Sequence, residues 1–238
     1  MDSLEKKIIP SIALLKGIVH SETDVKRMIK RTRWILTQDP QKTLVPSIAL
    51  LRTHGVPDSN ISKLLLLSGC SFLRTDSFIK NVKETKKREF DPSKVVFVMA
   101  VHVLSCLSKS SWEAKCGIYK RWGWSEKEIS SAFTLQPTCM GLSEKNIMST
   151  MEFLVNKMGF DPLLISKTPV VLSYSLEKRT IPRLSVIQVL VSNGIVKEDY
   201  KIMTLVNMSE KDFLRKYVTE FEGKVPELLS VYQGKTNS

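Results

Sequence analysis

The sequence predicts an all-α fold, an α-solenoid of about six helical repeats, and three observations support this prediction. Sequence segments recur at intervals of about 34 to 36 residues, a length that accommodates two helices and their connections. Apolar residues within each repeat follow helical spacing. No alternating pattern of the kind that predicts strands competes with the helical pattern.

The clearest recurrence is a short apolar segment. Residues 10–16 read PSIALLK, and residues 46–52 read PSIALLR, thirty-six positions later. Residues 3–10 are similar to residues 175–182 at an offset of 172, which is close to five periods of about 34. Two different segments therefore indicate nearly the same period.

A glycine followed by an apolar residue marks most repeats and predicts where the first helix of the repeat ends. Glycine suits the C-terminal cap of a helix because it adopts a positive φ without a Cβ clash. A Leu or Met recurs with the same period in a third register. The pairs are Gly17-Ile18, Gly55-Val56, Gly123-Trp124, Gly159-Phe160 and Gly194-Ile195, with Glu89-Phe90 in the remaining slot; the third register is Leu36, Leu73, Leu107, Met140 and Leu172.

Each repeat is expected to contain a long helix, a turn and a shorter second helix. Residues 177–192 show the apolar spacing of the long helix, and residues 125–128 are a polar start for the second. Pro137 and Pro169 mark the ends of two repeats, because the residue before a proline disfavours helix. Three further prolines either lie near the first turn of the long helix or kink it: Pro10, Pro46 and Pro182.

The composition and motifs exclude several classes of protein. With 238 residues, 42% hydrophobic and 25% charged, the chain is expected to be globular and soluble, without a membrane span. The four cysteines form no Cys-x-x-Cys pair, so no metal site is expected. No phosphate-binding glycine loop, nucleophile elbow or His-Glu-x-x-His motif occurs, so we expect no enzyme, no cofactor and no small-molecule substrate. His102 lies in an apolar run and is expected in the core.

The charge balance indicates a polyanionic partner. Thirty-six Lys and Arg against 24 Asp and Glu give a net charge of +12. Nucleic acid is the first candidate for such a partner, and an anionic membrane surface is the second. The alternative is a generic positive surface without a specific ligand.

Several segments, taken in their order, resemble the mitochondrial transcription termination factor family, and in particular its plant branch. They are residues 31–36, the two PSIALL segments, residues 90–94, residues 122–126, and residues 169–172 running into 175–182. The resemblance implies three-helix repeats, two longer helices and a short third one, that curl into a superhelix. It also implies nucleic-acid binding along a basic concave groove in a mitochondrion or chloroplast, with roles in transcription termination, transcript processing or splicing.

Two departures from this family pattern stand out. A Pro precedes the Leu register only at Pro137 and Pro169, whereas Arg33, Cys70 and Leu104 take its place elsewhere. The sequence also begins inside a repeat and has no transit peptide. We therefore expect an N-terminal portion, with a transit peptide and one or more repeats, to be missing.

Clusters of cations are the candidates for phosphate contact. The alternative for every cluster is a solvated helix face. Trp122 and Trp124 beside the third cluster could stack on bases, although packing between repeats is the commoner role. The candidates are Lys26, Arg27, Lys30, Arg31 and Arg33; Lys80, Lys83, Lys87 and Arg88; Lys120 and Arg121; and, near the long helices of equivalent repeats, Arg52, Lys178, Arg179 and Arg183.

Together these features predict a monomer that binds duplex DNA or structured RNA through a basic groove. One solenoid domain is expected over residues 1–238, with residues 213–238 as capping helices and tail. The alternatives are a helical-repeat scaffold for proteins and a non-functional truncated paralogue. A reader of single-stranded RNA, one base per repeat, is disfavoured because no polar pair recurs at fixed positions.

Overall fold

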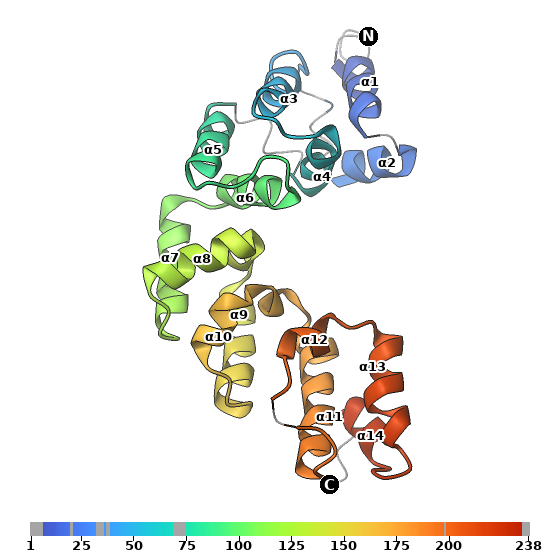
Figure 1. The fold of residues 1–238 in the computed structure, drawn as a ribbon. Helices are drawn as coiled ribbons and strands as arrows, with labels where there is room; N and C mark the ends of the chain where they lie inside the picture. The colour runs from blue at the N-terminus through green and yellow to red at the C-terminus, as the bar shows by residue number, and fades with distance from the viewer. Residues whose placement is uncertain are drawn as a thin grey trace. The chain divides into compact units, whose positions relative to one another are not determined.

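The computed structural model describes residues 7–19, 21–31, 36, 39–68, 75–197 and 199–234. All regular secondary structure in these ranges is helical (Figure 1). The prediction of an all-α helical-repeat fold is therefore confirmed. The chain forms two compact units: an N-terminal unit of residues 1–116 and 133–141, and a C-terminal unit of residues 117–132 and 142–238.

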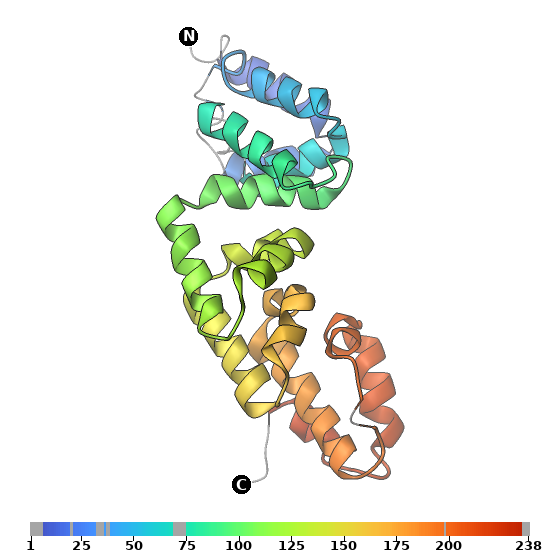
Figure 2. The ribbon, with the colours of Figure 1, turned by 60° about the vertical axis from the view of Figure 1, so that its left-hand side comes forward.

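Helix α6 is the centre of the N-terminal unit, where it packs against α4 and α5 (Figures 1 and 2). Its side chains Phe97, Val98 and Val101 are fully buried, and the short helix η4 packs on it as well. The helices of this unit are α1 (Ile9–Ile18), α2 (Glu22–Arg31), α3 (Leu44–Thr53), α4 (Asp58–Ser68), α5 (Thr75–Lys87), α6 (Val95–Cys106) and η4 (Pro137–Gly141), and α7 (Lys109–Lys120) and α8 (Glu126–Leu135) cross the boundary between the units.

Helix α11 has the corresponding position in the C-terminal unit, where it contacts η7, α12, α13 and α14. Its residues Leu184, Ile187 and Leu190 are fully buried. The remaining elements are α9 (Glu144–Met151), η5 (Glu152–Lys157), α10 (Pro162–Lys167), η6 (Pro169–Ser173), η7 (Leu176–Thr180), α11 (Ile181–Ser192), α12 (Ile202–Asn207), α13 (Glu210–Tyr217), η8 (Thr219–Phe221) and α14 (Leu228–Tyr232).

The turn after the first helix of the repeat has the same geometry in five repeats. φ is 85° at Gly55, 62° at Glu89, 83° at Gly123, 72° at Gly159 and 69° at Gly194. In three of these turns the next residue donates its N–H to a carbonyl five positions earlier, at 2.9 to 3.3 Å, as in a Schellman cap. The glycine register thus identifies helix ends correctly, and Glu89 does fill the same slot.

Gly17 does not belong to this register. It lies inside α1, and its φ is not positive. The chain leaves α1 at Val19, which donates its N–H to the carbonyl of Leu15 at 2.8 Å. The first repeat therefore ends its long helix without a glycine turn.

The short third helix is present where the register has a proline. Pro137 and Pro169 each begin a 3₁₀ helix, η4 and η6, and these helices bury Met140 and Leu172. Where Leu104 stands in place of proline, α6 instead continues through it to Cys106. The corresponding positions Arg33 and Cys70 lie outside the described residues.

Prolines start or nearly start the long helices. Pro10 and Pro182 are the second residues of α1 and α11. A π-helical turn, η7, comes directly before α11, and the missing N–H of Pro182 leaves no donor back into that turn. Pro46 is the third residue of α3.

No single helix among the described residues is long and apolar enough to cross a membrane, although the bent pair α6 and α7 meets the length and composition requirement when taken together. His102 is only partly buried, so its expected place in the core is wrong. Its Nδ1 lies 3.6 Å from the sulfur of Cys106, on the partly exposed side of α6.

Candidate nucleic-acid interface

Helix α5 has one apolar and one basic face. Phe78, Val82 and Thr85 point into the core and are fully buried, which fixes the rotation of the helix. The opposite side therefore presents Lys80, Lys83 and Lys87 to solvent. These three lysines follow the i, i+3, i+7 spacing of one helix stripe.

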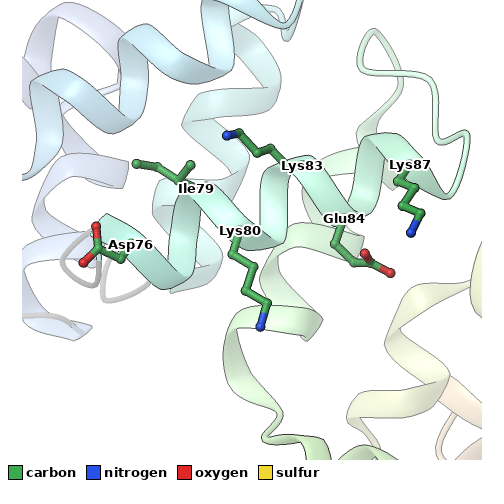
Figure 3. A pocket seen from close by; sticks show the side chains of 6 residues that line it. All are labelled: Asp76, Ile79, Lys80, Lys83, Glu84 and Lys87. Atoms are coloured by element: carbon green, nitrogen blue, oxygen red, sulfur yellow. The ribbon is translucent and has the colours of Figure 1, made fainter.

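An open hollow of about 350 Å³ lies along this face. In Figure 3, which looks onto this face, Lys80 and Lys87 extend below the helix and Lys83 extends above it, so the three side chains spread across the face. None of the three lysines forms an ion pair with a described residue. The hollow is lined by Asp76, Ile79, Lys80, Lys83, Glu84 and Lys87.

Arg88 has a different environment from the lysines of α5. Its Nε donates to Glu84 at 2.9 Å, and its guanidinium lies over Trp112 and Phe133, 5.2 and 5.6 Å from the ring centroids. Arg88 therefore neutralises Glu84, one of the two acidic residues that line the hollow, and packs against the aromatic side chains beside α5. Its contribution to the site is indirect.

Helix α2 carries a second exposed basic face. Val25 and Met28 are buried, so Lys26, Arg27 and Lys30 face solvent. Arg27 pairs with Asp24 at 3.3 Å, whereas the two lysines make no ion pair within the described part of the chain. Arg31 ends this helix, but its side chain is outside what the structure describes, as is all of Arg33.

Arg52 joins two helices of its own repeat. Its Nε and Nη2 each donate to an oxygen of Asp58 at 2.8 Å, a bidentate pair between the end of α3 and the start of α4. The hydrogen bond to Asp58 raises the pKa of Arg52 above its usual range. A phosphate would have to compete with this carboxylate.

Lys120 and Arg121 are also paired with acids. Lys120 Nζ lies 2.9 Å from Glu126, and this hydrogen bond lowers the pKa of Glu126. Arg121 donates to Glu144 in the next repeat. The two cations thus tie helix ends together within the C-terminal unit.

The tryptophans beside this pair pack between repeats. Trp124 is 2% exposed, stacks on Tyr119 with a centroid distance of 4.5 Å, and donates its Nε1 to the carbonyl of Pro162 at 2.9 Å. Trp122 donates to the sulfur of Met148 at 3.4 Å. Packing, the commoner of the two roles considered for them, is the role that the structure gives to both.

Arg183 is 1% exposed, and this burial corrects the expectation that it contacts a ligand. Its Nη1 donates to the carbonyls of Leu205 and Met208, both at 2.7 Å, and its guanidinium lies 4.9 Å from the centre of Phe213. Burial, with the nearby charge of Arg179, lowers the pKa of Arg183. The side chain satisfies carbonyls that the end of α12 leaves open.

Arg179, one helical turn before Arg183, also donates to carbonyls at the end of α12. Its Nε and Nη2 donate to the carbonyls of Val206 and Met208, both at 2.7 Å, and its guanidinium lies over Tyr174. Lys178, directly before Arg179 in the sequence, is exposed. Of the predicted cations in this repeat, Lys178 alone is exposed.

The structural role of the arginines was not foreseen from the sequence, although the repeat alignment carries a signal for Arg183. The equivalent positions after Pro10 and Pro46 are Ser11 and Ser47, both buried to 1% exposure or less. An arginine where other repeats bury a serine indicates an internal partner for its charge.

Residues 75–214, more than half of the chain, match the family model named mTERF. A search of curated proteins finds no match. Among the described residues no group of three or more His, Cys, Asp or Glu could hold a metal ion.

Proposed function

The chain belongs to the mTERF family, and from this premise we propose that it is a nucleic-acid-binding factor in the gene expression of a mitochondrion or chloroplast. The observation that carries the proposal is the lysine face of α5, which lies inside the matched residues. Three exposed ammonium groups along one open hollow suit a run of phosphates. In this role the chain acts as a monomeric binding protein rather than an enzyme.

Binding of this kind would be driven mainly by counterion release. Each phosphate that a lysine neutralises frees a condensed cation, so affinity falls steeply as salt is raised. Duplex DNA as the ligand would favour a role in transcription termination or regulation. Structured RNA as the ligand would favour transcript processing or splicing.

A protein scaffold is the second candidate, and exposed apolar side chains favour it. Leu163 and Leu164, neighbours on α10, are 40% and 45% exposed, and Leu135 at the end of α8 is 57% exposed. Apolar groups of this size at a surface are typical of protein interfaces when they form a patch.

Binding of the purified chain to matched duplex DNA, duplex RNA and single-stranded RNA tests the proposal. Fluorescence anisotropy at low and at physiological salt is the measurement. We expect saturable binding to at least one ligand and a marked loss of affinity at the higher salt. Weak binding to all three ligands that does not respond to salt would contradict the proposal and leave the scaffold as the better account.

A further inference from the structure

The positive charge of the protein is unevenly divided between its two compact units. The N-terminal unit contains 20 Lys and Arg against 11 Asp and Glu, a net charge of +9. The C-terminal unit contains 16 Lys and Arg against 13 Asp and Glu, a net charge of +3. The units are of similar length, so a polyanion is attracted mainly to the first.

Arginines do not account for this imbalance, because the described arginines of both units have internal partners. In the C-terminal unit this holds for all four arginines. Arg121 pairs with Glu144, and Arg215 pairs with Asp212 at 3.1 Å. Arg179 and Arg183 donate to backbone carbonyls. All four arginines of this unit therefore have internal partners, and a phosphate would have to displace those partners to reach them.

The lysines of α2 and α5 lie in the N-terminal unit and have no such partners among the described residues. Lys26 and Lys30 are one helical turn apart on α2, and Lys80, Lys83 and Lys87 share the open face of α5. Like charges at this spacing repel each other. A bound polyanion relieves that repulsion, so these two lysine faces favour the binding of a polyanion.

We propose that the N-terminal unit carries the phosphate contacts, centred on Lys80, Lys83 and Lys87, and that the C-terminal unit adds little to the affinity. This inference rests on the proposed function and narrows it to one part of the chain. The partner is the sugar–phosphate backbone of a nucleic acid, read as a line of charge.

Two matched triple variants of the full chain test the division. K80Q/K83Q/K87Q removes three charges from α5, and K157Q/K167Q/K178Q removes three from exposed lysines of the C-terminal unit. Glutamine keeps part of the aliphatic stem and is a good helix former. Far-UV circular dichroism and the melting temperature check that both variants remain folded.

The expected difference lies in the salt dependence of binding to duplex DNA or RNA. The slope of log K against log salt should become shallower by about 2.7 for K80Q/K83Q/K87Q, because each phosphate contact contributes about 0.9. For K157Q/K167Q/K178Q the slope should change by less than about one contact's share, 0.9.

The outcomes separate this inference from the proposed function. Equal changes of slope in both variants, or a larger change in K157Q/K167Q/K178Q, would overturn the division while the function stands. A wild-type chain that binds no ligand would overturn the function itself.

Discussion

Glu89 is the one non-glycine residue with positive φ in the described part of the chain. Its φ of 62° lies in the left-handed region, where glycine stands in four other repeats. A residue with a Cβ pays roughly 1–2 kcal/mol there, while glycine loses about 0.5–1 kcal/mol more backbone entropy on folding. The turn therefore holds a local strain that the repeat geometry imposes.

Glu89→Gly should stabilise the fold by about 0.5–1 kcal/mol, because the gain at positive φ exceeds the entropy of the added glycine. Equilibrium urea denaturation measures this gain: the midpoint should rise, while the dependence of the unfolding free energy on urea concentration stays unchanged. The reciprocal control is Gly123→Ala, which should destabilise by about 1 kcal/mol. No atom lies within 4 Å of a Cβ at Gly123, so the control reports backbone conformation alone. A destabilised Glu89→Gly would contradict this account.

Arg183 is a structural cation in the core. Arg183→Met should lower stability by about 2 kcal/mol, because the buried carbonyl of Leu205 loses the Arg183 donor, whereas the carbonyl of Met208 keeps Arg179. Thermal or urea unfolding gives the loss directly. Lys178→Met, at the exposed neighbour, should change stability by no more than about 0.5 kcal/mol. Comparable losses in both variants would refute a clamping role for Arg183.

At the residue scale, the sequence shows which residues are basic, but it does not show which of them face solvent and which make internal hydrogen bonds. Lys80 and Arg183 are both basic residues on repeat helices, yet one is exposed and the other is 1% exposed. The difference depends on which carbonyls of a helix 22 to 25 residues away reach the side chain. Such long-range contacts are fixed by tertiary packing and leave little local trace.

At the scale of elements, helix α8 begins with a capping box. Ser125 Oγ accepts from the N–H of Lys127 at 3.2 Å, and Glu128 accepts from the N–H of Ser125 at 2.9 Å. Ser125→Ala should therefore destabilise the C-terminal unit by about 1 kcal/mol, measured by urea unfolding. Ser125→Asp is the matched control, because aspartate also caps, and it should retain most of the stability. An alanine variant as stable as the wild type would contradict the role of the cap.

The same capping box makes stability depend on pH. Hydrogen bonds from the hydroxyl and the N–H of Ser125 lower the pKa of Glu128 below its ordinary value. Because the folded pKa is the lower one, the stabilisation is complete above the ordinary pKa and is lost as pH falls through the folded pKa. We expect Glu128→Gln to be less stable than the wild type at neutral pH and to converge with it in acid. A difference that stays constant with pH would show that the charge plays no part.

The order and ends of the elements could be predicted well from the sequence. The glycine register finds the turns at Gly55, Gly123, Gly159 and Gly194, since positive φ has a strong residue preference. It fails at Gly17, which α1 absorbs, because a glycine inside a helix is tolerated at modest cost. Pro137 and Pro169 correctly mark helix ends, because α8 ends at Leu135 and α10 ends at Lys167. The short helices that these prolines begin could not be derived from them.

At the scale of the whole molecule, the arrangement favours binding that ignores base sequence. All seven arginine side chains that the structure describes are engaged by carboxylates, carbonyls or aromatic rings. Bidentate recognition of guanine depends mainly on arginine, whereas the open lysines suit phosphates. On the proposed function, the molecule would therefore recognise a nucleic acid as a line of charge.

Two duplexes of equal composition and shuffled order test this property. Their affinities for the wild-type chain should agree within about tenfold, far below the ratio of about 10³ or more that specific binding gives. Competition anisotropy at one salt concentration is the measurement. A ratio near 10³ for any natural site against its shuffled form would show that arginines leave their internal partners to read bases.

The division of charge between the units could not be predicted from the sequence, because it depends on which residues fold together. Residues 133–141 belong to the N-terminal unit, although residues 117–132, which precede them in the sequence, belong to the C-terminal unit. A division of the sequence into two consecutive segments would not find these units. The net charge of +12 predicts a polyanionic partner but not its location.

Chemical protection of lysines tests the central claim most directly. The full chain is acetylated briefly with and without saturating nucleic acid, and mass spectrometry compares each lysine. We predict protection of Lys80, Lys83 and Lys87, weaker protection of Lys26 and Lys30, and unchanged labelling of Lys157, Lys167 and Lys178. Protection spread evenly over both groups, or confined to the second, would contradict an interface built on the lysines of the N-terminal unit.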